Sequence, residues 1–396
     1  MKQFKRITAL LLIIVMLLAL CACNAAPVAA PPAAPAAPQK TEEPSVVPAA
    51  PVEDDTSVIS FLDSAGRTVE IDRSTDKIAA LMAMSYHYMI MLKQTSRIKA
   101  CMSMNPWAYE ITDHVTQNAA DIQQITDAAQ ALNVEQLLED GIELVFYWPT
   151  RDDVLKECDD VGLPCVGISS SSSEVAATTA DEYIKTVTDD VFLYAKALGN
   201  GAEAIADQYF EYASEKIHMV EDRVSGLAKE DYKTVYWMRT SDDGLQAFCG
   251  GSVAESVCNI TGGTLVTTLE SGTGNVQNIS TYTTVTMEQL YEWDPDVILM
   301  GRTGNINIVL QNEQWDKLKA VKAGEVHICP TGVFNWDGGI EAPLMVIYVA
   351  QILHPELFED VNMKDEVKYF YSNFLGYDLT DDQAGYVLSR LGPDGK

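Results

Sequence analysis

Short apolar runs alternate with polar segments along most of the chain. Residues 58–61 and 68–71 flank the polar stretch Asp-Ser-Ala-Gly-Arg, and this order predicts a strand, a turn and a second strand. Another apolar run follows at 77–81, and residues 85–93, which are rich in Met and Tyr, predict a helix. Strand-like and helix-like segments continue to alternate beyond this point. The pattern therefore predicts an α/β fold.

One helix–strand unit occurs twice. Residues 133–139 lead into an apolar run at 143–148, and residues 286–292 lead into a similar run at 296–300. Both copies contain Glu-Gln-Leu-x-Glu, and in both an acidic residue opens the apolar run. A polar helical stretch and a further apolar run follow each copy. Two copies of a helix–strand–helix–strand unit predict two lobes of similar build.

A long helical region lies between the two copies. Residues 180–198 and 202–227 carry apolar positions at helical spacing, and a Gly-Asn-Gly sequence separates them. The second helix is expected to be a rod of roughly 39 Å, at 1.5 Å per residue. We expect a helix of that length to span both lobes and to hold them at a fixed separation.

The N-terminal residues have the pattern of an export signal. Lys2, Lys5 and Arg6 precede an apolar stretch over 7–20, which is shorter than the roughly 20 residues that a membrane-spanning helix needs. The stretch ends in Leu-Cys-Ala-Cys, which resembles the bacterial lipobox with Cys23 as the lipidated residue. We therefore expect a lipoprotein signal peptide over 1–22. An uncleaved anchor and an ordinary secretory signal are the alternatives.

Residues 23–56 are expected to form a tether outside the fold. Eight of the sixteen prolines fall between Pro27 and Pro51, spaced mainly by Ala and Val. Such a segment has little apolar surface to bury and favours extended, polyproline-like conformations. It is suited to connect a lipid at one end to the globular lobes at the other.

Composition and charge narrow the classes of function. The 396 residues, of which 47% are hydrophobic, are enough for about two domains. The chain carries 57 acidic and 27 basic residues, which give a formal net charge of −30. Such a surface repels phosphate backbones, and no basic cluster occurs beyond residues 2–6, so the charge argues against nucleic-acid binding. The mean hydropathy of −0.01 excludes a polytopic membrane protein.

These features together resemble the solute-binding proteins of ABC importers for iron chelates and cobalamin. The resemblance covers about residues 57–388, and the order of its motifs is more specific than any one of them. The motifs are Asp-Ser-Ala-Gly-Arg-Thr-Val at 63–69, both Glu-Gln-Leu units, Trp-Asp-Pro-Asp-Val-Ile at 293–298, the segment 315–326, Ala-Pro-Leu at 342–344 and Leu-His-Pro-Glu-Leu-Phe at 353–358. One departure is Asp-Gly-Ile-Glu at 140–143, where the family commonly has Lys-Pro-Asp.

The resemblance implies two Rossmann-like lobes joined by a long backbone helix, with a ligand cleft between the lobes. We accordingly expect an N-terminal lobe over 57–178, connecting helices over 179–228 and a C-terminal lobe over 229–396. The protein is expected to be a monomer outside the cytoplasm, held at the cell membrane by its lipid. Its expected partners are a small-molecule metal chelate and an ABC permease with its ATPase subunits.

Two glutamates correspond to positions with which the family docks onto the permease. Glu135 and Glu288 are expected to offer one carboxylate per lobe to arginines of the transporter. Two such carboxylates fix orientation more than they add affinity. The alternative is that both are solvated glutamates in the first turn of a helix, where negative charge is favourable.

Aromatic and arginine residues after predicted strands are the candidates for ligand contacts, because α/β sheets bind ligands at the carboxyl ends of their strands. The family places a cleft aromatic at Trp148, and Arg302 follows a strand. The other candidates are Tyr86, His87, Trp107, Tyr109, Trp237, Arg239, Phe334 and Trp336. Aromatic faces and arginines suit a large chelate with anionic oxygens. For any single aromatic residue, core packing is the commoner role.

The ligand that the resemblance implies is a ferric chelate of the siderophore type, with haem and cobalamin as alternatives. His87 and the six methionines between residues 82 and 104 are conceivable contacts for a haem or corrin face. Five scattered histidines argue against a cage for a bare metal ion, so we expect no intrinsic metal or cofactor. Cys158 with Cys165, or Cys249 with Cys258, are candidate pairs, but the sequence leaves their connectivity open.

An exported enzyme and a surface adhesin are the alternatives from other classes. No nucleophile elbow, phosphate loop or HExxH motif occurs in the sequence. The glycines of 244–251 also lack the spacing of a dinucleotide fingerprint. We therefore assign no catalytic residue and expect a binding protein rather than an enzyme.

Overall fold

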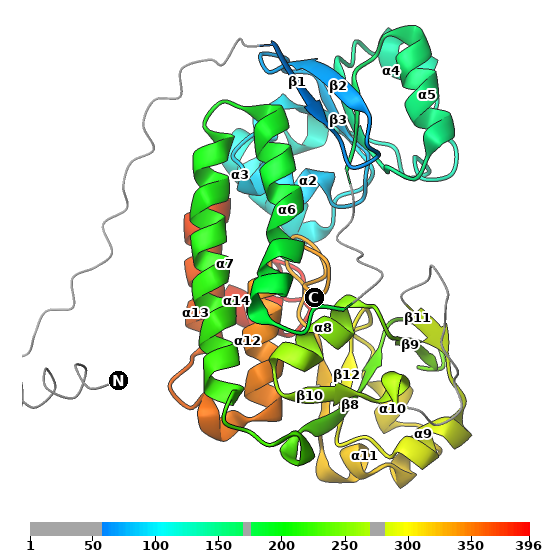
Figure 1. Cartoon of the computed structure of the whole chain (residues 1–396), viewed down its shortest axis with the longest axis vertical. Coiled ribbons are helices and arrows are strands. Elements are labelled where there is room, and N and C mark those ends of the chain that lie inside the picture. The colour runs from blue at the N-terminus through cyan, green and yellow to red at the C-terminus, as the bar shows by residue number, and fades with distance from the viewer. Residues whose placement is uncertain (1–57, 169–175, 270–281) are drawn as a thin grey trace, which may run out of the picture. The chain divides into compact units, whose positions relative to one another are not determined.

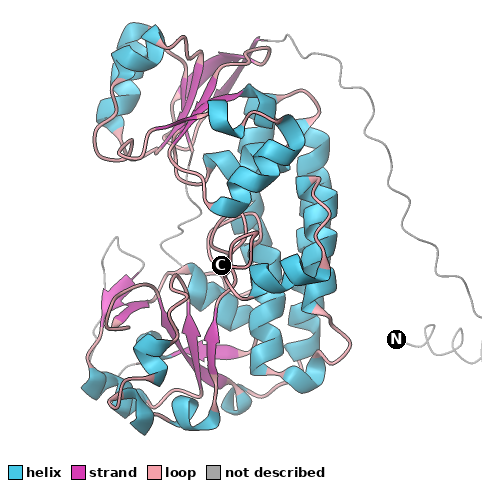
Figure 2. Cartoon of the chain, turned by 180° about the vertical axis from the view of Figure 1, so that it is seen from behind, coloured by secondary structure: helices cyan, strands magenta, loops and turns pink. Residues whose placement is uncertain are grey.

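The computed structural model describes residues 58–168, 176–269 and 282–396, all of which belong to one compact unit, Pro51–Lys396. The expected signal peptide, the lipid site at Cys23 and the tether lie outside the described residues. Figure 1 shows two sheets with a pair of long helices running between them, and Figure 2 shows the same arrangement from behind. No described helix is both long and apolar enough to cross a membrane.

The first two strands form the predicted hairpin. β1 (Val58–Leu62) pairs with β2 (Thr68–Asp72) in antiparallel register, with Phe61 opposite Val69. Asp63 closes the turn, because its Oδ1 accepts the backbone N–H groups of Ala65 and Arg67 at 3.0 and 2.9 Å. The Arg67 guanidinium then donates to Asp63 at 2.8 Å and to the carbonyl oxygen of Cys165 at 2.6 Å. The Asp-x-x-Gly-Arg motif thus ties the hairpin to the first large sheet.

The first large sheet has five parallel strands in the order β5-β4-β3-β6-β7. Its strands are β3 (Ile78–Ala80), β4 (Ile98–Cys101), β5 (Gln123–Gln124), β6 (Leu144–Tyr147) and β7 (Cys165–Gly167). Its helices are α2 (Ser85–Met91), α3 (Pro106–Thr116), α4 (Val134–Glu139) and α5 (Asp152–Val161). Every residue of β3 and β6 is buried, as expected for continuous apolar runs in a parallel sheet.

The second large sheet has six strands, and its central part is also parallel. The strands are β8 (Lys233–Met238), β9 (Gln246–Phe248), β10 (Gly263–Leu265), β11 (Tyr282–Thr284), β12 (Val297–Met300) and β13 (Val326–Ile328). β10, β8, β12 and β13 run parallel, whereas β9 and β11 add an antiparallel edge. The helices of this half are α8 (Val253–Ile260), α9 (Met287–Trp293), α10 (Asn307–Leu310) and α11 (Lys319–Ala323).

The internal repeat occupies equivalent places in the two sheets. α4 leads into β6, which lies between β3 and β7, and α9 leads into β12, which lies between β8 and β13. Side chains cap both helices: Asn133 accepts the N–H of Gln136, and Thr286 forms a reciprocal capping box with Gln289. The prediction of two α/β units of similar build is confirmed.

The two predicted long helices are α6 (Ala180–Leu198) and α7 (Ala202–Val224). They pack against each other as a hairpin between the two sheets (Figure 1). At one end of the hairpin, Arg97 of the first sheet's half donates to the carbonyl oxygen of Leu198 at 2.7 Å. The second helix ends three residues before the predicted position, because Ser225 bonds back to the carbonyl oxygen of Asp222 and Gly226 follows.

The C-terminal helices complete the unit and share its core. They are α12 (Ala342–Leu353), α13 (Met363–Phe370) and α14 (Asp381–Leu388). Short 3₁₀ turns occur at Thr95–Arg97, Ala119–Asp121, Lys229–Asp231, Val266–Thr268, Trp315–Lys317 and Pro355–Leu357, and a π turn at Tyr371–Leu375. One hydrophobic cluster contains Ile78 of the first sheet, Tyr194 and Tyr209 of the hairpin, Val297 of the second sheet and Phe374. The observed architecture is therefore the predicted one: an α/β fold with two sheets joined by a helical connection.

Candidate ligand-binding site

A cavity of about 470 Å³ lies where the two halves of the chain meet. The residues that follow β3 and β4 build one wall, and the segment after β13, together with residues 390–396, builds the other. The cavity therefore lies at the carboxyl ends of parallel strands from both sheets, where α/β proteins bind their ligands. Its volume is in the range for small organic molecules.

His87 lies in the wall of this cavity and has no hydrogen-bond partner for Nδ1 among the described residues. Only 3% of the residue is exposed, and its ring lies 4.5 Å from the ring of Phe334, measured between centroids. Burial lowers the pKa of His87 to about 3. The imidazole is therefore neutral at physiological pH and keeps a lone pair that a ligand can use.

Asn105 connects the two walls of the cavity. Its Oδ1 accepts the N–H of Ala108 at 2.8 Å and so caps α3. Its Nδ2 donates to the carbonyl oxygens of Gly332 and Val333 at 2.8 and 2.9 Å. One side chain thus fixes the start of α3 against the segment that follows β13.

Trp107 lines the cavity from the first turn of α3, although it is only 1% exposed. Its Nε1 donates to the carbonyl oxygen of Leu391 at 2.8 Å. The indole also meets the rings of Tyr371 and Tyr377 edge-on. Trp107 therefore has a packing role beside its place in the cavity wall.

Arg302 follows β12 and is oriented by a buried carboxylate. Its Nε donates to Oδ2 of Asp337 at 2.9 Å, and the side chain of Asp337 is 1% exposed. The Arg302 side chain keeps 28% of its surface exposed. The guanidinium also lies 5.8 Å from the centroid of the Phe248 ring. This side chain is both held in place and accessible.

Two further arginines lie beside Arg302: the backbone N–H of Arg302 donates to the carbonyl oxygen of Arg239 at 2.8 Å, and Nη1 of Arg390 donates to the carbonyl oxygen of Gly301 at 3.0 Å. Burial and the charge of Arg302 lower the pKa of Arg239, whose guanidinium lies 4.0 Å from the centroid of the Tyr282 ring. Burial, with a smaller effect of Arg302, also lowers the pKa of Arg390, which lines the cavity. Both remain cations, because the pKa of an arginine in water is above 12.

Arg390 is held by neutral groups rather than by a carboxylate. Its Nη1 donates to the carbonyl oxygens of Gly301 and Cys329 at 3.0 and 3.2 Å, and Nη2 donates to Asn335 at 2.5 Å. Within the described ranges, Asp337 is the one carboxylate that pairs with any of the three arginines. The end of the second sheet is therefore locally positive in a strongly acidic protein, which favours an anionic ligand.

The other predicted contact residues lie outside the cavity lining. Trp148 follows β6 and is half-buried against the core, with its ring edge-on to Tyr147. Tyr109 is 40% exposed on α3. Trp237 and Trp336 are fully buried, in the packing role that is commoner for single aromatics.

Tyr86 joins two helices of the first half. It is 1% exposed, and its hydroxyl donates to the carbonyl oxygen of Ala108 at 2.8 Å and also bonds to Thr112. This places its hydroxyl between α2 and α3. Of the ten predicted contacts, His87, Trp107 and Phe334 line the cavity, and the structure brings Arg239 and Arg302 together beside it.

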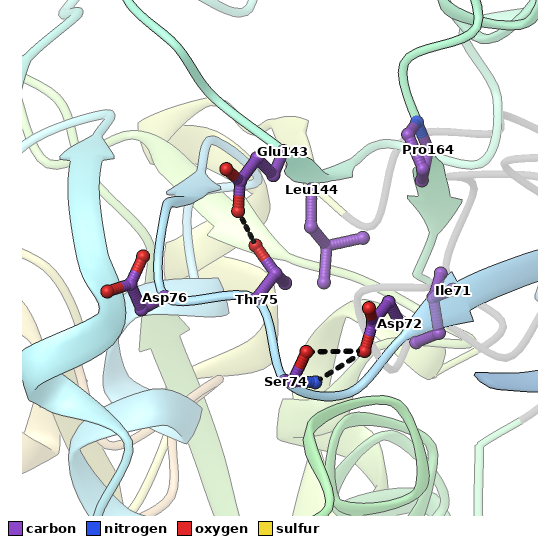
Figure 3. A pocket seen from close by; sticks show the side chains of 8 residues that line it. All are labelled: Ile71, Asp72, Ser74, Thr75, Asp76, Glu143, Leu144 and Pro164. Atoms are coloured by element: carbon purple, nitrogen blue, oxygen red, sulfur yellow. Dashed lines mark hydrogen bonds between the residues drawn. The ribbon is translucent and has the colours of Figure 1, made fainter. Parts of the chain in front are cut away.

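A second cavity, of about 500 Å³, lies at the amino ends of β3 and β6 (Figure 3). Four of its polar groups bond to one another: Thr75 donates to Glu143 at 2.6 Å, and Ser74 donates to Asp72 at 2.7 Å. It lies at the end of the sheet opposite to the usual ligand edge, and its carboxylates repel anions. We therefore place the ligand site in the cavity between the halves.

The two predicted docking glutamates are exposed in the first turns of α4 and α9. Glu135 and Glu288 make no ion pair with any residue of the described ranges. Since α4 and α9 are the equivalent helices of the repeat, each half of the chain presents one such carboxylate. Their role in docking stays a prediction.

The candidate cysteine pairs and the methionines of residues 82–104 lie mostly in the core. Cys158, Cys165 and Cys258 are buried free thiols. Among the methionines, Met102 lines the cavity, whereas the side chains of Met89 and Met91 are buried in the core.

Sequence reasoning missed Asn105, Asp337 and Arg390. Asn105 precedes a proline at the start of a helix, which is a capping signal, but capping alone does not indicate a second bond across a cavity. Asp337 and Arg390 have no motif around them, and their roles depend on contacts between distant parts of the chain.

No protein-family model matches this chain. It is 23% identical over 342 residues to the molybdate-binding protein MolA of Haemophilus influenzae. The aligned region covers 81% of this chain and 92% of MolA. The solved structure of MolA bound to molybdate covers 81% of this chain and 99% of its own, with 20% identity and a TM-score of 0.67.

Two further solved structures have the same fold. A nickel–histidine complex of CeuE from Helicobacter pylori covers 82% of this chain and 98% of its own, with 17% identity and a TM-score of 0.62. The TroA-like periplasmic binding protein FepB from Veillonella parvula covers 81% of this chain and 97% of its own, with 18% identity and a TM-score of 0.61. The fold that the sequence resemblance implies is confirmed: the described chain has the two-lobed fold of the TroA-like periplasmic solute-binding proteins.

Proposed function

We propose that this chain is the extracytoplasmic substrate-binding protein of an ABC importer, anchored by a lipid on Cys23, and that it captures an anionic metal chelate of the ferric siderophore type. The observation that carries the proposal is the grouping of Arg239, Arg302 and Arg390 at the carboxyl end of the second sheet, beside a cavity between the two halves. The proposal is supported further by the fold, which is that of known solute-binding proteins.

The walls of the cavity suit an organic chelate better than a small ion. Three arginines can bind catecholate or carboxylate oxygens through their planar guanidinium groups. The rings of His87 and Phe334 and the edge of Trp107 offer apolar and aromatic surface on the other side. The neutral His87 nitrogen also suits a metal centre with an open coordination position. Of the three arginines, Arg390 lines the cavity of about 470 Å³ itself, and Arg302 and Arg239 lie beside it.

Molybdate is the second candidate ligand. The similarity to MolA over 81% of the chain favours it, and the arginines suit a tetrahedral oxyanion as well as a chelate. A lone oxyanion would leave most of the cavity empty. Haem and cobalamin are further candidates, for which the buried neutral His87 would be the axial contact.

Delivery of the ligand requires a contact with the permease. In this proposal Glu135 and Glu288 dock onto basic sockets of a two-fold symmetric permease, one from each half of the protein. Their exposure at equivalent helix starts supports this role. Such charge pairs set orientation and association rate more than affinity.

The test is to purify the protein from its native host and record its visible spectrum together with its metal content. A charge-transfer band with one equivalent of iron supports the ferric chelate. A Soret band or a corrin spectrum would instead assign haem or cobalamin, and bound molybdenum without visible absorption would assign molybdate. A protein that turns over any of these ligands would contradict the proposal, because an importer's binding protein releases its ligand unchanged.

A further inference from the structure

The ion pair between Arg302 and Asp337 uses only the Nε–H donor of the Arg302 guanidinium. The bond runs from Nε to Oδ2 at 2.9 Å, and Asp337 is almost fully buried. Within the described ranges, no other protein group accepts a hydrogen bond from the Arg302 guanidinium. The two terminal nitrogens are therefore left for another acceptor, and an arginine with this pattern binds anionic oxygens end-on.

One terminal nitrogen of Arg302, Nη2, borders a space between the two halves. A Cβ atom built on Gly338 would lie 3.8 Å from Nη2 of Arg302, 3.6 Å from Sδ of Met84 and 3.8 Å from Cε1 of Phe334. Met84 belongs to the first half and Phe334 lines the cavity. The absence of a side chain at Gly338 thus leaves one space that the guanidinium, the methionine and the phenyl ring share.

We infer that Asp337 is a positioning residue, which holds Arg302 by its Nε so that Nη1 and Nη2 bind a pair of adjacent anionic oxygens on the ligand. The inference rests on the proposed function and names the chemistry of the ligand more closely. Catecholates, carboxylates and tetrahedral oxyanions all present such a pair of oxygens. Arg302 then recognises the oxygens and not the rest of the ligand.

The charge of Asp337 has a second consequence. It offsets one of the three guanidinium charges of Arg239, Arg302 and Arg390, so this group carries a net charge of +2. The group therefore matches a ligand with two negative charges better than one with a single charge. Removal of the carboxylate's charge should strengthen the attraction for every anion, whereas loss of its hydrogen bond should disorder Arg302. Two substitutions separate these effects.

Asp337→Asn keeps an oxygen acceptor for Nε but removes the charge, and Asp337→Ala removes both. The probes are molybdate and the ferric complex of 2,3-dihydroxybenzoate, measured by titration and by stopped-flow association at low and at physiological salt. We expect Asp337→Ala to weaken binding about tenfold, equal to the loss of about 1.4 kcal/mol. We expect Asp337→Asn to bind at least as tightly as the wild type and to associate faster at low salt.

Asp360→Asn is the matched control. It also removes one carboxylate from an arginine pair, since Arg223 and Asp360 are joined at 2.6 Å, and it changes the net charge of the protein by the same amount. It should leave binding of both probes unchanged. The Nε–Hε resonance of Arg302 provides a second readout without ligand: its hydrogen exchange should be slow in the wild type and in Asp337→Asn, and fast in Asp337→Ala.

The outcomes separate the inference from the proposed function. The inference is overturned if the wild type binds either probe and Asp337→Ala and Asp337→Asn weaken that binding equally. The proposed function would then stay intact. Binding of only molybdate would assign a free oxyanion, and binding of only the ferric complex would assign a chelate; both support the inference if the two substitutions differ as expected. Wild-type protein that binds neither probe would overturn the anionic ligand class and the role of Asp337 with it.

Discussion

The indole nitrogen of Trp107 in α3 donates a hydrogen bond of 2.8 Å to the carbonyl oxygen of Leu391, which lies beyond α14. Nearby, the hydroxyl of Tyr377 bonds to Glu110 at 3.1 Å. The helix hairpin α6–α7 is therefore not the only link between the two halves of the protein. The C-terminal helices form a second link, because Tyr371 and Tyr377 pack edge-on against Trp107 of α3.

Two links restrict the motion of the halves relative to each other. We expect only a small closure on ligand binding, with backbone shifts of about 1 Å or less, as in other preorganised complexes, and therefore almost no change in the radius of gyration. Small-angle X-ray scattering with and without bound ligand measures this change. A large domain closure, as in binding proteins with flexible hinges, would contradict the expected rigidity.

The Trp107–Leu391 bond should contribute measurably to stability. Trp107→Phe keeps most of the buried ring but leaves the Leu391 carbonyl without its partner, so we expect a loss of about 1–2 kcal/mol in the free energy of unfolding. Urea denaturation measures it. Tyr109→Phe on the same helix is the control, because Tyr109 is 40% exposed and its substitution should cost less than about 0.5 kcal/mol. Equal losses in the two variants would show that the bond contributes nothing.

The buried carboxyl group of Glu341 should make the free energy of unfolding depend on pH. Its Oε1 accepts the N–H of Val333 at 2.9 Å behind the cavity wall, and burial raises its pKa to about 8 from an ordinary value of 4.5. Below pH 4.5 the carboxyl is protonated in both the folded and the unfolded chain. Between pH 4.5 and about 8 only the unfolded chain releases the proton, so the free energy of unfolding falls as pH rises, by on the order of 4 kcal/mol.

Glu341→Gln mimics the protonated carboxyl and should remove this loss. Denaturant unfolding of the wild type and of the variant at pH 5 and at pH 8 gives the difference that belongs to Glu341, with about a 4 kcal/mol advantage for the variant at pH 8. His87 acts in the opposite direction, because burial lowers its pKa to about 3 and stability is lost as pH falls below 6.5. The comparison with Glu341→Gln cancels that contribution. An equal pH dependence in both proteins would show that Glu341 is ionised in the fold.

Much of the fold was predictable from local patterns. The hairpin around Asp63, the buried strands and the two long helices follow from apolar periodicity and turn residues, and the structure has all of them. The end of α7 was placed too late because apolar spacing continues to Leu227, whereas Ser225 and Gly226 end the helix through local bonding and low helix propensity.

The site was less predictable, since it depends on contacts between distant segments. A strand-end position selected Phe334, which lines the cavity, and Arg302, which lies beside it, but the same reasoning also selected Trp237 and Trp336, which are fully buried. Position after a strand does not distinguish a side chain that faces the cavity from one that packs beneath it. Asp337 and Arg390 could not be found from sequence, because their partners are 35 and 89 residues away.

The docking prediction can be tested by uptake. Glu135→Ala combined with Glu288→Ala should abolish ligand uptake by cells and leave the affinity of the purified protein unchanged. The matched control is Glu139→Ala with Glu292→Ala, which removes the other exposed glutamates of the same two helices. Normal uptake in the first double variant, or an equal loss in the control, would remove the assigned docking role.

The most direct test of the central claim is equilibrium dialysis of the purified chain against the ferric 2,3-dihydroxybenzoate complex and against molybdate, with Arg302→Ala and Gly338→Leu beside the wild type. We expect one equivalent of anion bound to the wild type, little binding by Arg302→Ala, and none by Gly338→Leu, whose side chain would fill the space beside Arg302. Binding that is equal in all three proteins would contradict the assignment of the ligand site to this cavity.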